Sequence, residues 1–161
     1  MTKTKILFLC THNSARSQIA EGLLRHLYGD EYEVFSAGTN PTHVNPLAVK
    51  VMAEIGIDIS GQYSKSLDVF KDIDIDLVVS VCRGNSKINC AICASPMIMG
   101  KPELIASRLP KAKDYLDYPF NDPSDVEGTE EEKLAAFRRT RDEMKTWIIG
   151  RFANSKVVKA K

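Results

Sequence analysis

The apolar and polar residues of this chain alternate in blocks that predict strands and helices in turn. Continuous apolar runs at residues 6–9 and 76–81 are typical of parallel strands that are covered on both faces. Apolar side chains recur at helical spacing in residues 19–27, 46–55 and 130–151, and each segment predicts a helix with one buried face. The pattern therefore indicates a chain in which strands and helices follow one another.

Three further segments complete the predicted order. Residues 32–37 have the pattern of a second strand, residues 66–70 that of a short helix, and residues 111–115 that of a fourth strand. This order predicts an α/β fold with a four-stranded parallel sheet flanked by helices on both faces. We expect a single domain over residues 1–161, with a frayed basic tail from about residue 153. Ligands of such sheets bind beyond the carboxyl ends of the strands.

The composition indicates a soluble globular protein and narrows the range of partners. Apolar residues make up 43% of the chain and charged residues 27%. The formal net charge of +1 gives no reason to expect nucleic acid or a membrane surface as a partner. The first apolar run is too short for a signal peptide, and no segment approaches the ~20 apolar residues of a membrane span. We therefore expect a cytoplasmic protein, whose four cysteines are catalytic or metal-binding rather than structural.

Candidate chemistry is concentrated where the first predicted strand ends. Cys10 follows the apolar run, and Arg16 and Ser17 come after five intervening residues. These five residues are small or hydrogen-bonding, and their backbone N–H groups can turn around one oxyanion: Thr11, His12, Asn13, Ser14 and Ala15. A helix that begins near Ser14 adds positive potential that favours the thiolate of Cys10. Arg16 supplies a planar fork that matches a tetrahedral oxyanion.

The sequence Cys-x5-Arg-Ser after one hydrophobic strand resembles the low-molecular-weight protein tyrosine phosphatase family. The form CTHNSARSQIAEGLLRH, with Ser36-Ala37-Gly38 downstream, more closely resembles the thioredoxin-coupled arsenate reductases of that fold, and the match runs from about residue 5 to 147. The resemblance implies reduction of arsenate to arsenite, with a thioredoxin-type dithiol as reductant and no cofactor. Phosphate is expected to compete with arsenate because it has the same shape and charge.

Asn121, Asp122 and Pro123 form a polar turn between the predicted fourth strand and the last helix. In the family that the chain resembles, an Asp-Pro loop at this place supplies the general acid, and the resemblance assigns that role to Asp122. The phosphatases carry aromatic residues soon after this dipeptide, whereas this chain has the polar and acidic residues 124–128. This departure favours a small inorganic oxyanion over a phosphotyrosine as substrate.

The remaining cysteines are Cys82, Cys90 and Cys93. Arsenate reduction takes two electrons and needs a second thiol near Cys10, and Cys82 at the end of the third predicted strand is the candidate. The resemblance implies a further thiol several residues on, either Cys90 or Cys93, and the spacing to Cys90 is closer to the family pattern. A helix over the eight steps from Cys82 to Cys90 would hold their Cα atoms ~12 Å apart, whereas a disulfide needs roughly 4.4–6.8 Å. We therefore expect this segment to reorganise when the disulfide forms.

Other functions stay open at this point. The protein can be a phosphatase of the same fold whose extra cysteines protect or regulate Cys10. Alternatively, the three later cysteines bind a metal or arsenite as thiolates, with His12 or His43 as a fourth zinc ligand. The last two cysteines also have the Cys-x2-Cys spacing of a redox pair.

Further assignments concern the residues that surround the loop. Ser17 can donate a hydrogen bond to the thiolate of Cys10. Glu21 and Ser36 resemble positions that hold a potassium ion in some relatives, but Lys65 replaces their remaining acidic ligand. The ammonium of Lys65 is therefore expected where the ion lies in those relatives, which argues against potassium dependence.

Overall fold

The computed structural model describes residues 2–82 and 111–153. Within these residues, four parallel strands form one sheet in the order β2-β1-β3-β4. The strands are β1 (Thr4–Cys10), β2 (Tyr32–Gly38), β3 (Ile75–Cys82) and β4 (Ala112–Phe120). The helices of the same residues are α1 (Arg16–Tyr28), α2 (Pro46–Ala53) and α4 (Glu130–Phe152), with the 3-10 helices η1 (Leu67–Phe70) and η2 (Pro123–Asp125). The predicted tail from residue 154 lies outside the described residues, as do Cys90 and Cys93.

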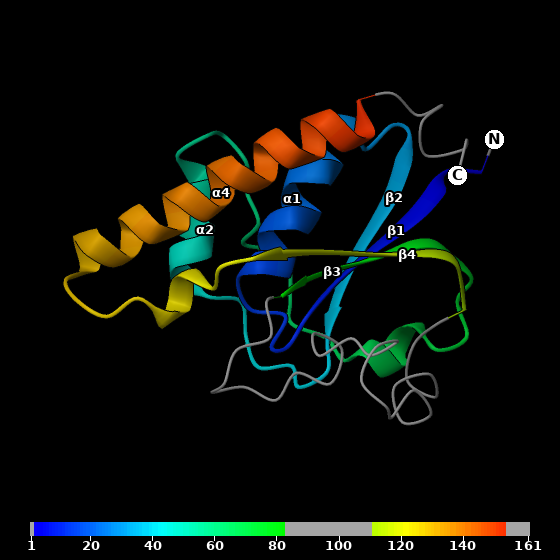
Figure 1. The fold of residues 1–161 in the computed structure, drawn as a ribbon, viewed down its shortest axis with the longest axis horizontal. Helices are drawn as coiled ribbons and strands as arrows, with labels where there is room; N and C mark the ends of the chain where they lie inside the picture. Colours follow the sequence, from blue (N-terminus) through cyan, green and yellow to red (C-terminus); the bar gives the residue numbers. More distant parts are fainter. Residues whose placement is uncertain (1, 83–110, 154–161) are drawn as a thin grey trace.

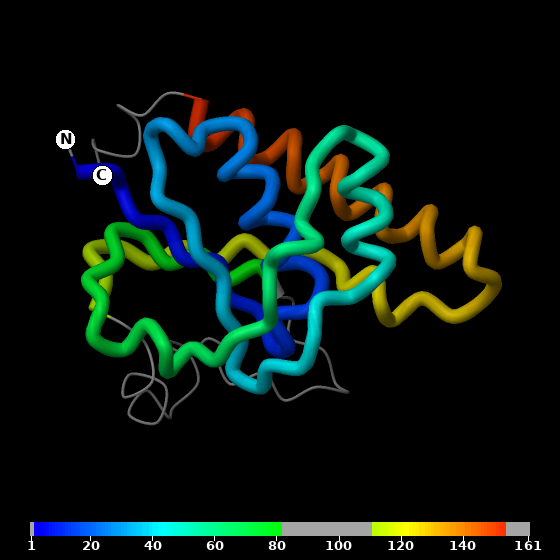
Figure 2. The backbone as a smooth tube through the Cα atoms, turned by 180° about the vertical axis from the view of Figure 1, so that it is seen from behind, coloured from blue at the N-terminus to red at the C-terminus, as the bar shows by residue number. Residues whose placement is uncertain are grey.

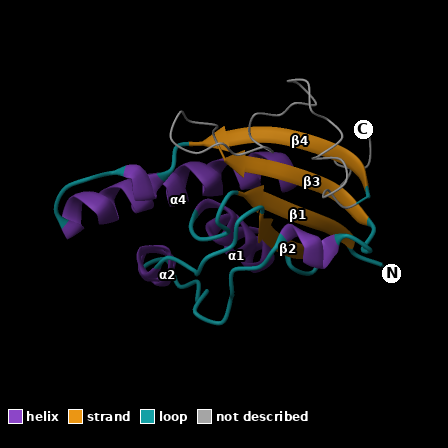
Figure 3. Ribbon diagram, turned by 90° about the horizontal axis from the view of Figure 1, so that it is seen from below, coloured by secondary structure: helices purple, strands orange, loops and turns teal. Residues whose placement is uncertain are grey.

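Helices cover both faces of the sheet, as predicted (Figure 1, Figure 3). The helices α1, α2 and α4 lie on one face, and η1 lies on the other. Side chains of β1 alternate between two buried layers. Ile6, Phe8 and Cys10 belong to the core beneath the larger helices, whereas Leu7 and Leu9 pack in the layer that contains η1. This alternation explains why the first apolar run has no polar positions.

The sequence predicts β1, β2 and β3 to within two residues at each end, but it predicts only the first part of β4. β1 and β3 are the inner strands, and both were predicted as apolar runs covered on two faces. β4 is an edge strand that exposes many of its side chains. It runs to Phe120, five residues beyond the predicted end at residue 115. The prediction was too short because an edge strand needs no continuous apolar pattern.

The carboxyl ends of all four strands meet at one edge of the sheet. β1 and β3 end there at Cys10 and Cys82, and β4 leads from there into the turn that contains Asp122. Figure 2 shows the chain after α2 returning from the helical layer to the side of η1. On this path Ser66 forms an isolated bridge with Gly38 at the end of β2. No helix in the described part of the chain has the length and apolar character needed to cross a membrane.

Candidate active site

Residues 11–15 form a tight loop around the carboxyl end of β1. Each carbonyl group of residues 11–14 accepts a hydrogen bond from outside the loop, three of them from backbone N–H groups of residues 40–45 at 2.8–3.2 Å. Because the N–H and C=O groups of one peptide point in opposite directions, we infer that the N–H groups of the loop turn inward, toward Cys10. Gly38 permits this close fit, since a Cβ there would lie 2.6 Å from the carbonyl oxygen of Thr11.

The thiol of Cys10, at the start of this loop, contacts the first turn of α1. Cys10 is buried, and its Sγ lies 2.8 Å from Oγ of Ser17 in the first turn of α1. Asn13 donates through Nδ2 to Oγ of Ser17 at 2.7 Å and to Oγ of Ser36 at 2.9 Å. The backbone of Asn13 has a φ of 49°, a left-handed conformation that asparagine adopts more readily than most residues. Asn13 therefore connects the loop to β2 and to the hydroxyl group beside the thiol.

Gln18 belongs to this site, although the sequence analysis did not assign it a role. Its side chain is fully buried, and Nε2 donates to the carbonyl oxygens of Asn13 and Tyr63, both at 3.0 Å. Gln62 donates in turn to Oε1 of Gln18 at 2.7 Å. The signal in the sequence was slight, because a glutamine in the first turn of a helix ordinarily faces solvent. Its burial depends on residues 62–63, which are distant in the sequence.

Arg16 is the first residue of α1, and its guanidinium contacts the end of β4. Nη1 donates to the carbonyl oxygen of Phe120 and Nη2 to Oδ2 of Asp122, both at 3.2 Å. The ion pair is largely buried, with 6% and 9% of the two side chains exposed. Oδ1 of Asp122 accepts hydrogen bonds from the backbone N–H and the hydroxyl group of Ser124, at 3.0 and 2.6 Å. The fold thus brings the predicted oxyanion ligand and the predicted general acid into direct contact.

Lys65 lies among polar groups on the side of the loop that faces β2. Its Nζ is 3.6 Å from Oε1 of Glu21 and donates to Oγ of Ser36 at 3.5 Å and to the carbonyl oxygen of Tyr63 at 2.9 Å. Burial lowers the pKa of Lys65, and the carboxylate of Glu21 opposes part of this shift. The ammonium therefore lies between the carboxylate of Glu21 and the hydroxyl group of Ser36.

Cys82 ends β3 on the same edge of the sheet as Cys10. In the adjacent inner strands Leu9 is the partner of Ser80, so the two cysteines end their strands within one residue of the same level. On its other side, the backbone of Cys82 pairs with Phe120 of β4. The two candidates for the further thiol, Cys90 and Cys93, lie outside the described residues. Among residues 2–82 and 111–153, no three histidine, cysteine or carboxylate side chains gather as metal ligands.

Comparison with known sequences finds close relatives along most of the chain. Residues 5–160 match the family described as low molecular weight phosphotyrosine protein phosphatase. An arsenate reductase from Halalkalibacterium halodurans is 44% identical over 144 residues, which cover 89% of this chain and 91% of that relative.

Solved structures agree with the sequence comparison. An arsenate reductase in the phosphate binding state superposes with a TM-score of 0.67 at 30% identity, over 91% of this chain and 95% of that one. A thioredoxin-dependent arsenate reductase from Corynebacterium glutamicum superposes with a TM-score of 0.51 at 28% identity, over 92% of this chain and 63% of that one. These similarities confirm the predicted fold and the predicted relationship. The chain belongs to the low molecular weight phosphotyrosine protein phosphatase family, and within it to the group of the arsenate reductases.

Proposed function

We propose that this protein reduces arsenate to arsenite through a relay of cysteine thiols. Cys10 lies beside Ser17 at the end of β1, and β3 brings Cys82 to the same edge of the sheet. This juxtaposition of two strand-end cysteines is the observation that carries the proposal, because phosphate transfer needs only the first thiol. The names of the similar arsenate reductases support the same reaction.

The first step forms a bond between Sγ of Cys10 and arsenic. The arsenate oxygens accept hydrogen bonds from the N–H groups of residues 11–15 and from the guanidinium of Arg16. Arg16 therefore gives up its ion pair with Asp122 when it binds the oxyanion. Ser17 donates a hydrogen bond that keeps the thiolate in position for the attack. Asp122, released from its ion pair with Arg16, takes up the proton that the thiol of Cys10 loses and gives it to the departing hydroxyl group, which leaves as water.

The second step transfers two electrons to arsenic. The thiolate of Cys82 attacks Sγ of Cys10, the sulfur–arsenic bond breaks, and its electron pair stays on arsenic. Arsenite leaves, and the two thiols become a Cys10–Cys82 disulfide. Cys90, or failing that Cys93, then attacks Cys82 and frees Cys10.

Two partners follow from this scheme. A thioredoxin-type dithiol reduces the final disulfide, and the thioredoxin dependence of the relative from Corynebacterium glutamicum supports this partner. Phosphate competes with arsenate for the loop, and the similar structure in the phosphate binding state supports this competition. No cofactor takes part, because all the electrons come from thiols.

Mapping disulfides after one turnover tests the relay. Reduced protein is mixed with one equivalent of arsenate in the absence of reductant, alkylated and digested for mass spectrometry. We expect a disulfide that joins Cys82 to Cys90 or to Cys93. In the double variant Cys90→Ser/Cys93→Ser, we expect the Cys10–Cys82 disulfide to accumulate instead. Unchanged arsenite turnover in Cys82→Ser would overturn the relay.

Hydrolysis of phosphate esters is the second candidate function. The family is described as a phosphatase, and Cys10, Arg16 and Asp122 are the groups that phosphate transfer through a thiol requires. Release of p-nitrophenol from its phosphate ester measures this activity. Ester hydrolysis that persists in Cys82→Ser, together with no arsenite formation by the wild-type protein, would favour the phosphatase.

A further inference from the structure

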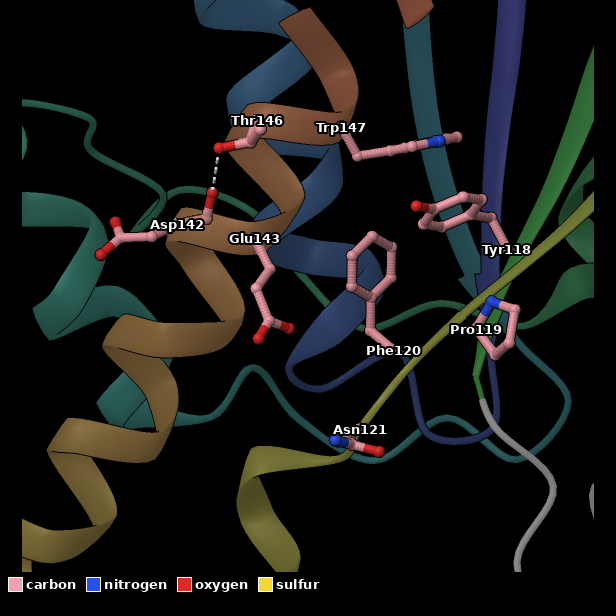
Figure 4. Close-up of a pocket in the computed structure, with 8 residues that line it drawn as sticks. All are labelled: Tyr118, Pro119, Phe120, Asn121, Asp142, Glu143, Thr146 and Trp147. Carbon is pink, nitrogen blue, oxygen red and sulfur yellow. Dashed lines mark hydrogen bonds between the residues drawn. The ribbon is translucent and has the colours of Figure 1, made fainter. Parts of the chain in front are cut away.

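A pocket of about 550 Å³ lies between the end of β4 and one face of α4 (Figure 4). Residues 118–121 form one wall, and α4 contributes Glu143 and Trp147 to the other. The pocket adjoins the candidate active site, because the carbonyl oxygen of Phe120 accepts the hydrogen bond from Arg16. It also adjoins the predicted relay, since the backbone of Phe120 pairs with Cys82 in the sheet.

The wall of the pocket is aromatic and partly exposed. The rings of Tyr118 and Trp147 are stacked, with centroids 4.7 Å apart and planes inclined by 24°. Phe120 meets Trp147 edge-on, at 6.0 Å between centroids. Tyr118 is 42% exposed, so part of its ring is accessible at the surface. Exposed tyrosine and tryptophan side chains are enriched where proteins bind one another.

Two carboxylates, those of Asp142 and Glu143, line the rim of the pocket. Glu143 is exposed, and within the described part of the chain its carboxylate has no hydrogen bond or ion pair. Figure 4 shows it extending from α4 toward the side on which Phe120 and Asn121 lie. The carboxylate of the adjacent Asp142 accepts a hydrogen bond from Arg141 at 2.8 Å. Aromatic faces and the carboxylate of Glu143 attract a cation, whereas the carboxylate repels an oxyanion such as arsenate.

We propose that this pocket is the docking site of the protein dithiol that reduces the enzyme, and that it receives a lysine or arginine side chain of that protein. This inference rests on the function proposed above. The dithiol must reach a disulfide that includes Cys82, and Cys82 is paired with a residue of the pocket wall. A protein that reaches this sheet edge therefore covers the pocket, whereas a small thiol does not.

Steady-state arsenate reduction with two reductants tests the proposal. The variants are Glu143→Gln, Tyr118→Ala and, as a control for charge, Glu33→Gln on the opposite edge strand β2. With a thioredoxin-type protein as reductant, we expect its KM to rise about fivefold in Glu143→Gln and about tenfold in Tyr118→Ala. With dithiothreitol we expect the rates of both variants to match the wild type. Unchanged KM for the protein reductant in both variants, or an equal effect in Glu33→Gln, would overturn the proposal.

The fluorescence of Trp147 tests the cation site without any turnover. Trp147 is the single tryptophan of the chain, so its emission reports on this pocket alone. We expect N-acetyl-argininamide to change the emission saturably, and the neutral N-acetyl-citrullinamide to change it little. The response to the arginine compound should be lost in Glu143→Gln. An equal response to both compounds would contradict a cation site. Absence of arsenite with either reductant would instead contradict the proposed function and leave this titration unaffected.

Discussion

At the scale of single residues, the loop around Cys10 depends on hydrogen bonds of both the side chain and the backbone of Asn13. Its Nδ2 donates hydrogen bonds to Ser17 and Ser36, and its Oδ1 accepts a hydrogen bond from the backbone N–H of Lys65 at 2.9 Å. Its carbonyl oxygen accepts a hydrogen bond from Gln18. These contacts hold Asn13 in its left-handed conformation, and so fix the direction of the neighbouring peptide groups.

Gln18→Ala is expected to loosen this loop. The substitution leaves the buried carbonyl oxygen of Asn13 without its donor, which should lower the free energy of unfolding by about 1–3 kcal/mol. The carbonyl oxygen of Tyr63 keeps the hydrogen bond from Lys65. Urea denaturation measures the loss. Gln62→Ala is the control, because it keeps the bond from Gln18 to Asn13 and should cost less. Equal losses in the two variants would contradict a specific role for the contact with Asn13.

Lys65 leads to a prediction about potassium. Its ammonium lies against Glu21 and Ser36, so the melting temperature of the wild-type protein should be equal in sodium and potassium chloride of the same concentration. Lys65→Asp replaces the ammonium with a third oxygen ligand. We expect this variant to melt about 3 °C higher in saturating potassium than in sodium, because the ion binds only the folded state. Differential scanning calorimetry measures both values, and a potassium effect on the wild type would refute the assignment.

At the scale of the elements, three of the four strands were predictable and the edge strand β4 was only partly so. β1 and β3 bury both faces, and this leaves continuous apolar runs, which differ from the spaced apolar positions of α1, α2 and α4. β4 is paired only with β3 and exposes residues such as Tyr115 and Tyr118, so its second half has no strand pattern. How clearly a strand can be predicted from its own residues therefore depends on whether neighbouring elements bury both of its faces.

The contact between α2 and α4 gives a prediction about acid stability. Glu54 at the end of α2 accepts hydrogen bonds from Arg138 at 2.8 Å and from Arg141 at 3.0 Å in α4. The bonds from Arg138, and then those from Arg141, lower the pKa of Glu54 to about 2 from an ordinary value of 4.5. A lowered folded-state pKa means that the contact stabilises the protein above pH 4.5 and loses its effect as the pH falls toward 2.

Glu54→Gln should therefore be less stable than the wild type at pH 7, and the difference should shrink between pH 4.5 and pH 2. Urea midpoints measured across this range provide the test. Glu33→Gln, which alters an exposed carboxylate away from both helices, serves as the control. A difference that stays constant down to pH 2 would show that the charge of Glu54 is not responsible.

At the scale of the whole molecule, the sequence predicted candidate reacting groups but not the contacts between them. Cys10 and Arg16 are close in the sequence, and the Cys-x5-Arg spacing indicated them as candidates. The contact of Arg16 with Asp122 joins segments more than a hundred residues apart, and it exists because β4 ends and α1 begins at the same edge of the sheet. Gln18 acquires its role in the same way, through distant residues that pack against it.

Binding of an oxyanion should stabilise the entire domain. Phosphate that binds only the folded protein raises the melting temperature by about 3 °C at ten times its dissociation constant. Arg16→Lys keeps the charge but removes the planar fork, and it should lose most of this rise. Thermal melts at increasing phosphate and constant ionic strength measure the effect, with sodium chloride as the control. An undiminished rise in Arg16→Lys would place phosphate elsewhere.

The buried pair of Arg16 and Asp122 also bears on how the reaction finishes. Arsenate carries negative charge and can draw the guanidinium away from Asp122, at a cost that weakens its apparent affinity. Arsenite is uncharged at neutral pH and offers no such attraction, so the guanidinium goes back to Asp122 once reduction is complete. Under the proposed reaction, the ion pair between Arg16 and Asp122 therefore weakens the binding of arsenate and speeds the release of arsenite.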